Sequence, residues 1–257
     1  MKITILTLFP EMFESYLNNS IIKRAIAKEK VIFELINIRD FTLDKNHRVD
    51  DYPTGGGAGL IMKCQPIYDA LQSVKTTTSK VLLTSPRGQT FNQQKAISLS
   101  KEDHLIFICG HYEGIDERIN KYADELISIG DFILTGGEVP VMAISDAIIR
   151  LIPGVITEGS INEESFNNGL LEYPQYTLPY EFNLETIPDI LFSGNHKAIE
   201  KWRKKESIKL TKLHRPDLFD KYHFNKQESK LIEELELKET PKWEKDALEK
   251  GHKFIKK

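Results

Sequence analysis

The sequence predicts an α/β fold built on a parallel sheet and followed by a helical region. Three observations support this prediction. Apolar runs of strand length alternate with helix-length segments up to residue 153, as in strands joined by right-handed crossovers. Several of these runs are continuously apolar and end in glycine, which is typical of strands buried on both faces. Beyond residue 195 only helical patterns continue.

The first elements follow a strand–helix–strand order. Residues 2–9 (KITILTLF) and 31–38 (VIFELINI) predict strands, and residues 20–30 (SIIKRAIAKEK) predict the helix between them. Glu11 and Glu14 come directly after the first apolar run and no small-residue cleavage site follows. A strand is therefore favoured over a signal peptide at this end of the chain.

A polar loop ending in GGGAG leads from these elements into the middle of the sheet. Residues 65–74 predict a helix, and KVLLT (80–84) predicts a strand that ends at the turn SPRG. Residues 92–100 predict another helix, with Asn92 as its N-cap.

Two buried strands and an apolar helix complete this region. Residues 104–110 (HLIFICG) and 125–130 (ELISIG) predict the strands. The helix follows, with Pro140 near its start and Pro153 past its end.

Three consecutive regions are expected from this pattern. Residues 1–157 form the α/β domain, and residues 158–176, which lack periodicity, form an interdomain linker. Residues 177–257 form a small helical domain with helices over HKAIEKWRKKESIKLTKL, KQESKLIEELELK and PKWEKDALEKGHKFIKK.

Composition excludes several classes of protein. No run approaches the 18 apolar residues of a membrane span, so no membrane association is expected. The two cysteines, Cys64 and Cys109, lack a metal-ligand spacing, and no metal site is assigned. Cys109 falls in a buried strand and is interpreted as a core residue. Sparse cysteine suits a reducing, cytoplasmic location.

The net charge of −3 conceals an asymmetry. Residues 1–195 contain 17 Lys and Arg against 26 Asp and Glu, whereas residues 196–257 contain 18 against 12. Residues 197–215 alone carry eight basic side chains and two acidic ones. This contrast suggests that the C-terminal region binds a polyanion, although a solvated helix face would give the same pattern.

The two loops after the glycine-ended strands are the strongest functional signal. Five glycines occur within residues 110–137, and loops at the carboxyl ends of parallel strands are where open α/β sheets bind ligands. Glycines can equally serve only to form turns. The GGGAG segment matches neither the G-x-G-x-x-G fingerprint nor a Walker loop, which disfavours dehydrogenases and P-loop NTPases.

The ordered set YPTGGGAG, TSPRG, CGHYEGIDERI, SIGDFILTGGE, AIIRLIPGV, ESFNNGLLEYPQYT, LFSGNHKAIEKWR and HRPDL resembles the bacterial tRNA (guanine-N1)-methyltransferase family, TrmD type, over about residues 1–222. The resemblance implies a SPOUT-type parallel sheet with a deep trefoil knot made by loops 84–88, 110–114 and 129–140, followed by the helical domain. It also implies an obligate homodimer, with the active site between one subunit's knot and its partner's linker and C-terminal domain.

The same resemblance implies S-adenosylmethionine as methyl donor and tRNA as substrate, methylated at N1 of guanosine 37, next to the anticodon. A supporting role for Mg²⁺ is allowed. The residues expected to hold the donor are Pro86, Gly110, Tyr112, Glu113, Ile129, Gly130, Asp131, Phe132, Ile133, Leu134, Gly136 and Gly137.

Two catalytic residues are implied by position. Guanine N1 must lose a proton, which a carboxylate can accept, while a guanidinium near O6 stabilises the resulting charge. The family has Asp before Ser-Phe, and this chain has Glu164 there, beside Glu163 as an alternative base. Arg150 is the expected cation. Without the resemblance, Arg150 would be interpreted as a complement to its helix dipole and Glu164 as a surface charge.

Three further questions stay open at this stage. Trp202 could stack on a nucleotide or pack in the core of its helix. His47 and His111 are more often structural than catalytic. One alternative to the expected reaction is a 2′-O-ribose or other RNA methyltransferase, against which GGGAG and the linker pattern ESFNNGLLEYPQYT argue. The other is a non-catalytic RNA-binding protein that kept the fold after the acid position changed.

Overall fold

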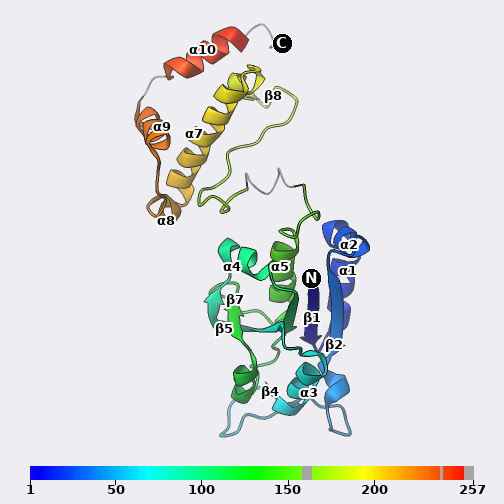
Figure 1. Cartoon of the computed structure of the whole chain (residues 1–257). Coiled ribbons are helices and arrows are strands. Elements are labelled where there is room, and N and C mark those ends of the chain that lie inside the picture. The colour runs from blue at the N-terminus through cyan, green and yellow to red at the C-terminus, as the bar shows by residue number, and fades with distance from the viewer. Residues whose placement is uncertain (158–163, 238–239, 252–257) are drawn as a thin grey trace. The chain divides into compact units, whose positions relative to one another are not determined.

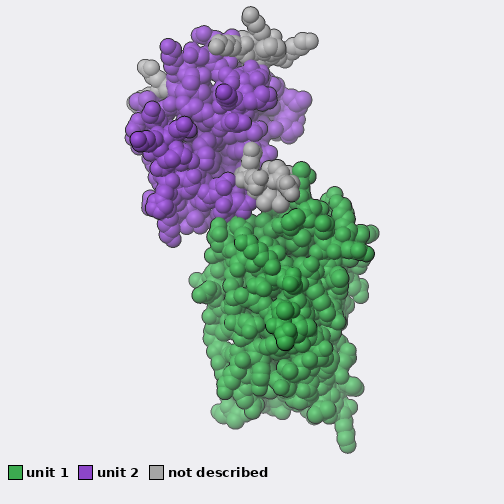
Figure 2. All heavy atoms as spheres, in the orientation of Figure 1, with its two compact units in different colours: residues 1–158 green, residues 159–257 purple. Residues whose placement is uncertain are grey.

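The structure is a computed structural model that describes residues 1–157, 164–237 and 240–251. The chain divides into two compact units, Met1–Glu158 (unit 1) and Gly159–Lys257 (unit 2), which Figure 2 distinguishes by colour.

Unit 1 is organised around a five-stranded sheet (Figure 1). All its strands run parallel, in the order β2-β1-β6-β5-β7. They are β1 (Lys2–Thr7), β2 (Ile32–Asn37), β5 (Ser79–Thr90), β6 (His104–Ile108) and β7 (Glu125–Ser128). The predicted α/β class with a parallel sheet is therefore confirmed.

The helices of unit 1 follow the predicted order, apart from the short α1, which was not predicted. They are α1 (Glu14–Leu17), α2 (Ser20–Ala27), α3 (Cys64–Val74), α4 (Gln93–Leu99) and α5 (Glu138–Ile149), with 3₁₀ turns η1 (Pro10–Phe13), η2 (Ile38–Phe41) and η3 (Glu117–Tyr122). Asn92 caps α4 as expected, because its side chain accepts a hydrogen bond from the Lys95 N–H at 2.9 Å.

Both faces of the sheet are buried, since neighbouring residues of each strand pack into different cores. On β6, Leu105 and Phe107 pack with α2, α4 and α5, while Ile106 and Ile108 pack with α3. All four are fully buried. A strand covered on two sides has no polar face, which explains why β6 is apolar at every position after His104.

Two features near the ligand-binding edge were not predicted. β3 (Asp50–Asp51) and β4 (Ile61–Met62) form a short antiparallel pair inside the expected polar loop, because two-residue strands are too short to produce a periodic signal. The SPRG turn also does not end its strand. Thr84 and Gln89 both pair with Ile127, so residues 85–88 form an excursion from one strand, β5.

Unit 2 contains η4 (Asp189–Phe192), α7 (His196–His214), α8 (Pro216–Phe219), α9 (Lys226–Glu236) and α10 (Lys242–Gly251). A hairpin of β8 (Glu181–Phe182) and β9 (Glu185–Thr186) interrupts the expected purely helical pattern. The helix predicted over 241–257 is observed from Lys242 to Gly251, and its remainder lies outside the described residues.

His104, at the start of β6, makes stability depend on pH. Burial and the Lys2 ammonium lower the pKa of this imidazole from its usual 6.5, against the opposing effect of Glu34. The folded protein therefore binds fewer protons here than the unfolded chain does. Lowering the pH below 6.5 should favour unfolding, and the loss should level off once the folded imidazole is protonated as well.

We expect His104→Gln to reduce this pH dependence, by at most about 1.4 kcal/mol per pH unit for one proton. Urea unfolding followed by circular dichroism between about pH 5 and pH 7 measures the slope. Equal slopes for the variant and the parent protein would contradict this assignment.

Candidate functional site

A pocket of roughly 800 Å³ lies at the carboxyl ends of β5, β6 and β7, a volume typical of small-molecule sites. Its wall is made by the 85–88 excursion of β5, the loop after β6 and the loop between β7 and α5. Eleven of the twelve predicted donor-binding residues line it: Pro86, Gly110, Tyr112, Glu113, Ile129, Gly130, Phe132, Ile133, Leu134, Gly136 and Gly137. Asp131 does not line the pocket, and its side chain is exposed.

Gly137 is where these segments pass closest to one another. Its N–H donates to the Gly110 carbonyl at 2.8 Å, which joins the start of α5 to the end of β6. A Cβ at this position would lie 2.3 Å from Thr84 Oγ1 and 2.7 Å from Cys109 Cα. Only glycine allows this approach, so the glycine here has a packing role beyond turn formation.

Residues next to Gly137 and Gly110 make further contacts between the same loops. Gly136 forms an isolated antiparallel bridge with His111. Thr84 Oγ1 donates to the Ile108 carbonyl at 3.2 Å and accepts from the Gly110 N–H at 3.4 Å. The three loops are thus joined by backbone and hydroxyl hydrogen bonds, and the pocket wall is held by the ends of the strands themselves.

His111 is a pocket residue that the sequence interpretation left as structural. Its ring lies 4.8 Å from that of Phe9 and 5.0 Å from that of Tyr112. Its Nδ1 atom is buried and has no hydrogen-bond partner within the described residues. A buried polar atom of this kind in a pocket wall fits a site that accepts a polar ligand.

Below the pocket, α5 begins with a buried carboxylate. Glu138 is 1% exposed and accepts a hydrogen bond from the Thr7 hydroxyl at 2.7 Å. Burial, reinforced by the Glu138 charge, raises the pKa of the Cys109 thiol well above its usual range. Cys109 is therefore an unreactive core residue, as its place in an apolar strand predicts.

The GGGAG segment borders the pocket, a placement that the sequence did not indicate. The Glu113 N–H donates to the Leu60 carbonyl at 3.1 Å, and a Cβ on Gly59 would lie 2.3 Å from Glu113 Cγ. Gly59 has a φ of +77°, which favours glycine. The loop is therefore attached directly to a predicted donor-binding residue.

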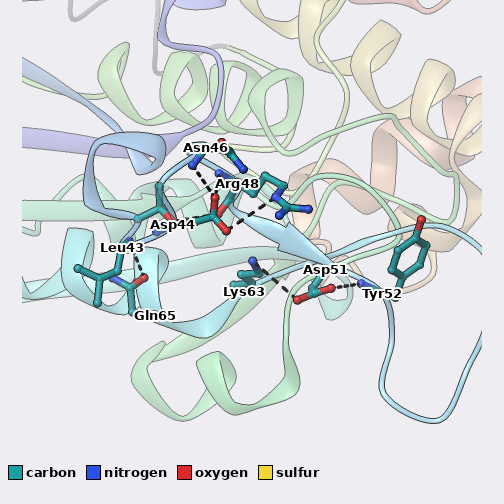
Figure 3. A network of polar contacts seen from close by, with 9 residues as sticks. Leu43, Asp44, Asn46, Arg48, Asp51, Tyr52, Lys63 and Gln65 are labelled. Carbon is teal, nitrogen blue, oxygen red and sulfur yellow. Dashed lines mark hydrogen bonds and ion pairs between the residues drawn. The ribbon is translucent and has the colours of Figure 1, made fainter.

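The rest of this loop is ordered by its own polar contacts, drawn in Figure 3. Asp44 Oδ1 accepts from the Asn46 and Arg48 backbone N–H groups at 2.8 and 3.4 Å. Lys63 Nζ lies 3.7 Å from Asp51 Oδ2, across the β3–β4 pair.

Ion pairs stabilise the segments around the pocket mouth. Arg87 donates to both carboxylate oxygens of Glu117, at 3.2 and 2.8 Å, which ties the SPRG excursion to η3. Asp116 is held in the same way by Arg118, and that hydrogen-bonded guanidinium lowers the pKa of the Asp116 carboxyl well below its usual range. Neither pair was predicted from the sequence. Glu117 lies 30 residues from Arg87, which no local pattern indicates, whereas Asp116 and Arg118 are only two positions apart within DERI.

The two expected catalytic residues belong to different units. Arg150 is the C-cap of α5 in unit 1, where its N–H donates to the Asp146 carbonyl at 3.2 Å. Glu164 begins a turn in unit 2. Glu163, the alternative base, lies outside the described residues.

The basic stretch of residues 197–215 is mostly α7, and much of its charge is paired within unit 2. At least six of its eight Lys and Arg residues lie within 4.0 Å of a carboxylate: Lys201, Lys204, Lys205, Lys209, Lys212 and Arg215. Trp202 is 5% exposed and packs with Ile190 and Ala247, so core packing is the better of its two interpretations.

Membrane spans and metal clusters are both absent from the described residues. Within them, no helix is long and apolar enough to cross a membrane. The same part of the chain holds no group of three or more His, Cys, Asp or Glu side chains arranged to bind a metal ion.

Comparison with known proteins identifies the family. The family described as tRNA (Guanine-1)-methyltransferase TrmD matches residues 1–221. The chain belongs to this family.

Close relatives extend over most of the chain. A tRNA (guanine-N(1)-)-methyltransferase of Clostridium botulinum (strain Eklund 17B / Type B) is 56% identical over 90% of this chain and 98% of its own length. That of Clostridium perfringens (strain SM101 / Type A) is 55% identical over 90% and 99%. That of Malacoplasma penetrans (strain HF-2) is 55% identical over 86% and 98%. The expected resemblance is thus confirmed over nearly the whole predicted span.

Two matched substitutions test whether the close approach of backbone at Gly137 excludes a side chain there. Gly137→Ala should destabilise unit 1 by about 2–3 kcal/mol, because the added methyl group would overlap Thr84 Oγ1 and the Cys109 backbone. Gly110→Ala is the control, since its nearest contact, Ile115 Cδ1, would lie at an ordinary 3.5 Å. Urea unfolding followed by circular dichroism compares the two, and equal losses would contradict the steric argument.

Proposed function

We propose that the protein transfers the methyl group of S-adenosylmethionine to N1 of guanosine 37 in tRNA, giving 1-methylguanosine. Family membership supplies the type of reaction. The observation that carries the assignment of the site is that eleven of twelve expected donor-binding residues line one glycine-walled pocket. The bound donor would supply a methyl group already activated by its sulfonium, so no covalent protein nucleophile is required.

The pocket residues fit such a donor. Glycines at 110, 136 and 137 bring main-chain groups to the wall without side chains in the way, and Phe132 and Leu134 add apolar surface. Backbone hydrogen-bonding groups combined with apolar walls suit a nucleoside. The close passage at Gly137 also supports our proposal that loops 84–88, 110–114 and 129–140 are threaded as the family's trefoil knot.

Proton removal from guanine N1 is assigned to Glu164, and stabilisation of the charge that develops on O6 is assigned to Arg150. A carboxylate is a competent base for this transfer, and an arginine matches a planar oxygen acceptor. Glutamate differs from the family's aspartate by one methylene, so the backbone at Glu164 must lie slightly further from the guanine N1 atom that its carboxylate deprotonates. No step of the proposed reaction is assigned to Mg²⁺.

A homodimer is part of the proposal. Ile133 is 82% exposed, and Phe132 and Val139 are about half exposed, which is unusual for large apolar side chains so close together in sequence. Val139 lies in the first turn of α5, most of whose other apolar side chains are already buried in unit 1. A second copy covering Phe132, Ile133 and Val139 would bury these exposed side chains, and the proposed dimer assigns the partner's unit 2 to the same active site.

The substrate tRNA is assigned to unit 2 together with the pocket, and the protein to the cytoplasm where tRNA is found. Because most α7 cations already have carboxylate partners, phosphates must compete with those partners for them. A modest number of phosphate contacts is therefore expected.

The decisive experiment is identification of the methylated nucleoside. Purified protein incubated with labelled S-adenosylmethionine and a tRNA transcript should yield 1-methylguanosine, detected after digestion by chromatography and mass spectrometry. A transcript with adenosine at position 37 serves as the control and should accept no label. Methylated ribose would instead indicate a 2′-O-methyltransferase, and no transfer at all a non-catalytic RNA-binding protein.

A mixing experiment tests the two catalytic residues and the dimer together. Arg150→Ala and Glu164→Ala should each reduce turnover by at least about a hundredfold, with donor affinity unchanged. After subunit exchange, a mixed dimer has one site with both residues intact, because each site combines one subunit's Arg150 with its partner's Glu164. An equal mixture should therefore recover about a quarter of the parent activity. A mixture as inactive as its components would contradict a shared site.

A further inference from the structure

The segment that carries Glu164 is attached to α7 by two hydroxyl groups. Thr211 is fully buried, and its Oγ1 accepts a hydrogen bond from the Leu171 N–H at 2.9 Å while donating to the Ser207 carbonyl at 2.7 Å. Ser207 Oγ donates to the Leu171 carbonyl at 2.6 Å. Both backbone polar groups of Leu171 are thus bonded to side chains that lie one helical turn apart.

Ser207 departs from the usual behaviour of a helical serine. A serine within a helix commonly donates to the carbonyl four residues earlier, as Ser229 of α9 does to Asn225 at 3.0 Å. Ser207 donates away from its own helix, to Leu171. Ser207 and Thr211, here called the hydroxyl pair, therefore both form hydrogen bonds from α7 to the backbone of Leu171.

A short network connects Leu171 to Glu164. The N–H of Glu172 donates to Ser165 Oγ at 2.9 Å, and the N–H of Phe166 donates to the Leu170 carbonyl at 2.9 Å. These bonds close residues 164–171 into a compact turn, here called the 164–171 turn. Leu170, 4% exposed, packs with Ile208 of α7, which adds an apolar anchor beside the hydroxyl pair.

The backbone of this turn is strained next to the proposed base. Phe166 has a φ of +72°, in the left-handed region that bulky residues rarely adopt. Such a conformation persists only where surrounding contacts hold it, and it is frequent where a functional group must be held in one orientation. The backbone of Phe166 is hydrogen-bonded to Gly169 and Leu170, and the next residue, Leu171, is bonded to α7.

We infer that Ser207 and Thr211 are positioning residues for methyl transfer, whose hydroxyls hold the 164–171 turn so that the Glu164 carboxylate is presented to guanine N1 in one orientation. This inference rests on the proposed function, because it takes Glu164 as the base. Neither hydroxyl touches the substrate in this scheme. Their effect comes from geometry, since small displacements of a catalytic group lower the rate of proton transfer steeply.

Thr211→Val tests the inference, because it removes the hydroxyl while keeping the shape of the side chain. We expect kcat for 1-methylguanosine formation to fall at least about tenfold, with KM for tRNA and Kd for S-adenosylmethionine within about twofold of the parent values. Thr211→Ser restores the hydroxyl and should recover most of the rate. Ser229→Ala is the matched control, since it deletes a hydroxyl of unit 2 that does not contact the turn.

Hydrogen exchange of the peptide spanning residues 164–172 provides a readout independent of activity. Its amides should exchange faster in Thr211→Val and in Ser207→Ala, but not in Ser229→Ala. Both tryptophans, Trp202 and Trp243, lie in unit 2, so their fluorescence reports whether that unit is still folded in each variant. If Thr211→Val does not fold, Ser207→Ala carries the test.

Three outcomes would overturn the inference. Parent-level kcat in a folded variant whose 164–172 amides exchange faster would show that the hydroxyl pair does not position the base. A higher KM for tRNA with unchanged kcat would assign the pair to substrate binding. An inactive parent protein would refute the proposed function, and the positioning role with it. If the parent is active, equal activity of the variants refutes the positioning role alone.

Discussion

The close passage of backbone at Gly137 is the constraint on which the pocket depends. The hydrogen bond from Gly137 to Gly110 and the close approach to Thr84 bring together the start of α5, the end of β6 and the point where β5 enters its 85–88 excursion, with no room for a side chain. The loops that leave those ends must then diverge around a common space, and this space is the pocket. A site formed in this way is held by a buried sheet, so its walls are stable before any ligand binds.

The proposed chemistry divides between two parts with different physical requirements. The donor pocket needs main-chain access and therefore glycine, and it lies on the rigid edge of unit 1. The proposed base needs orientation, and it lies on a turn of unit 2 that gains its shape from contacts with α7. The reaction as proposed requires these two parts to meet, and the proposed dimer provides for this.

The basic side chains of α7 have one structural role, pairing with carboxylates of unit 2, and one proposed role, binding tRNA phosphates. The amino-acid composition does not distinguish the two. Lys201 and Lys204 pair with Glu234 and Glu228 of α9, and Lys205 pairs with Glu244 of α10. Lys201 also lies over the Trp243 ring, 4.2 Å from its centroid. These ion pairs join the helices of unit 2, whose apolar cores are small. Part of the excess of Lys and Arg in this unit therefore stabilises its fold before any phosphate is bound.

The sequence by itself determined the order of the five sheet strands and of helices α2, α3, α4 and α5 in unit 1, the apolar character of β6, the cap at Asn92 and the family to which the chain belongs. Each of these follows from local periodicity or from motifs in fixed order, which need no knowledge of distant contacts. It also located the pocket, because the glycines and polar residues after β6 and β7 lie where neighbouring strand ends must meet.

The tertiary structure alone decided the rest. Pairing with Ile127 continues β5 beyond its turn, contact with Glu113 brings GGGAG to the pocket, and burial of Trp202 removes it from the surface. The partners of the α7 lysines and the bonds from Ser207 and Thr211 to Leu171 also appear only here. The Leu171 bonds span 36 and 40 residues, and such contacts depend on how elements pack, which no local pattern of residues encodes.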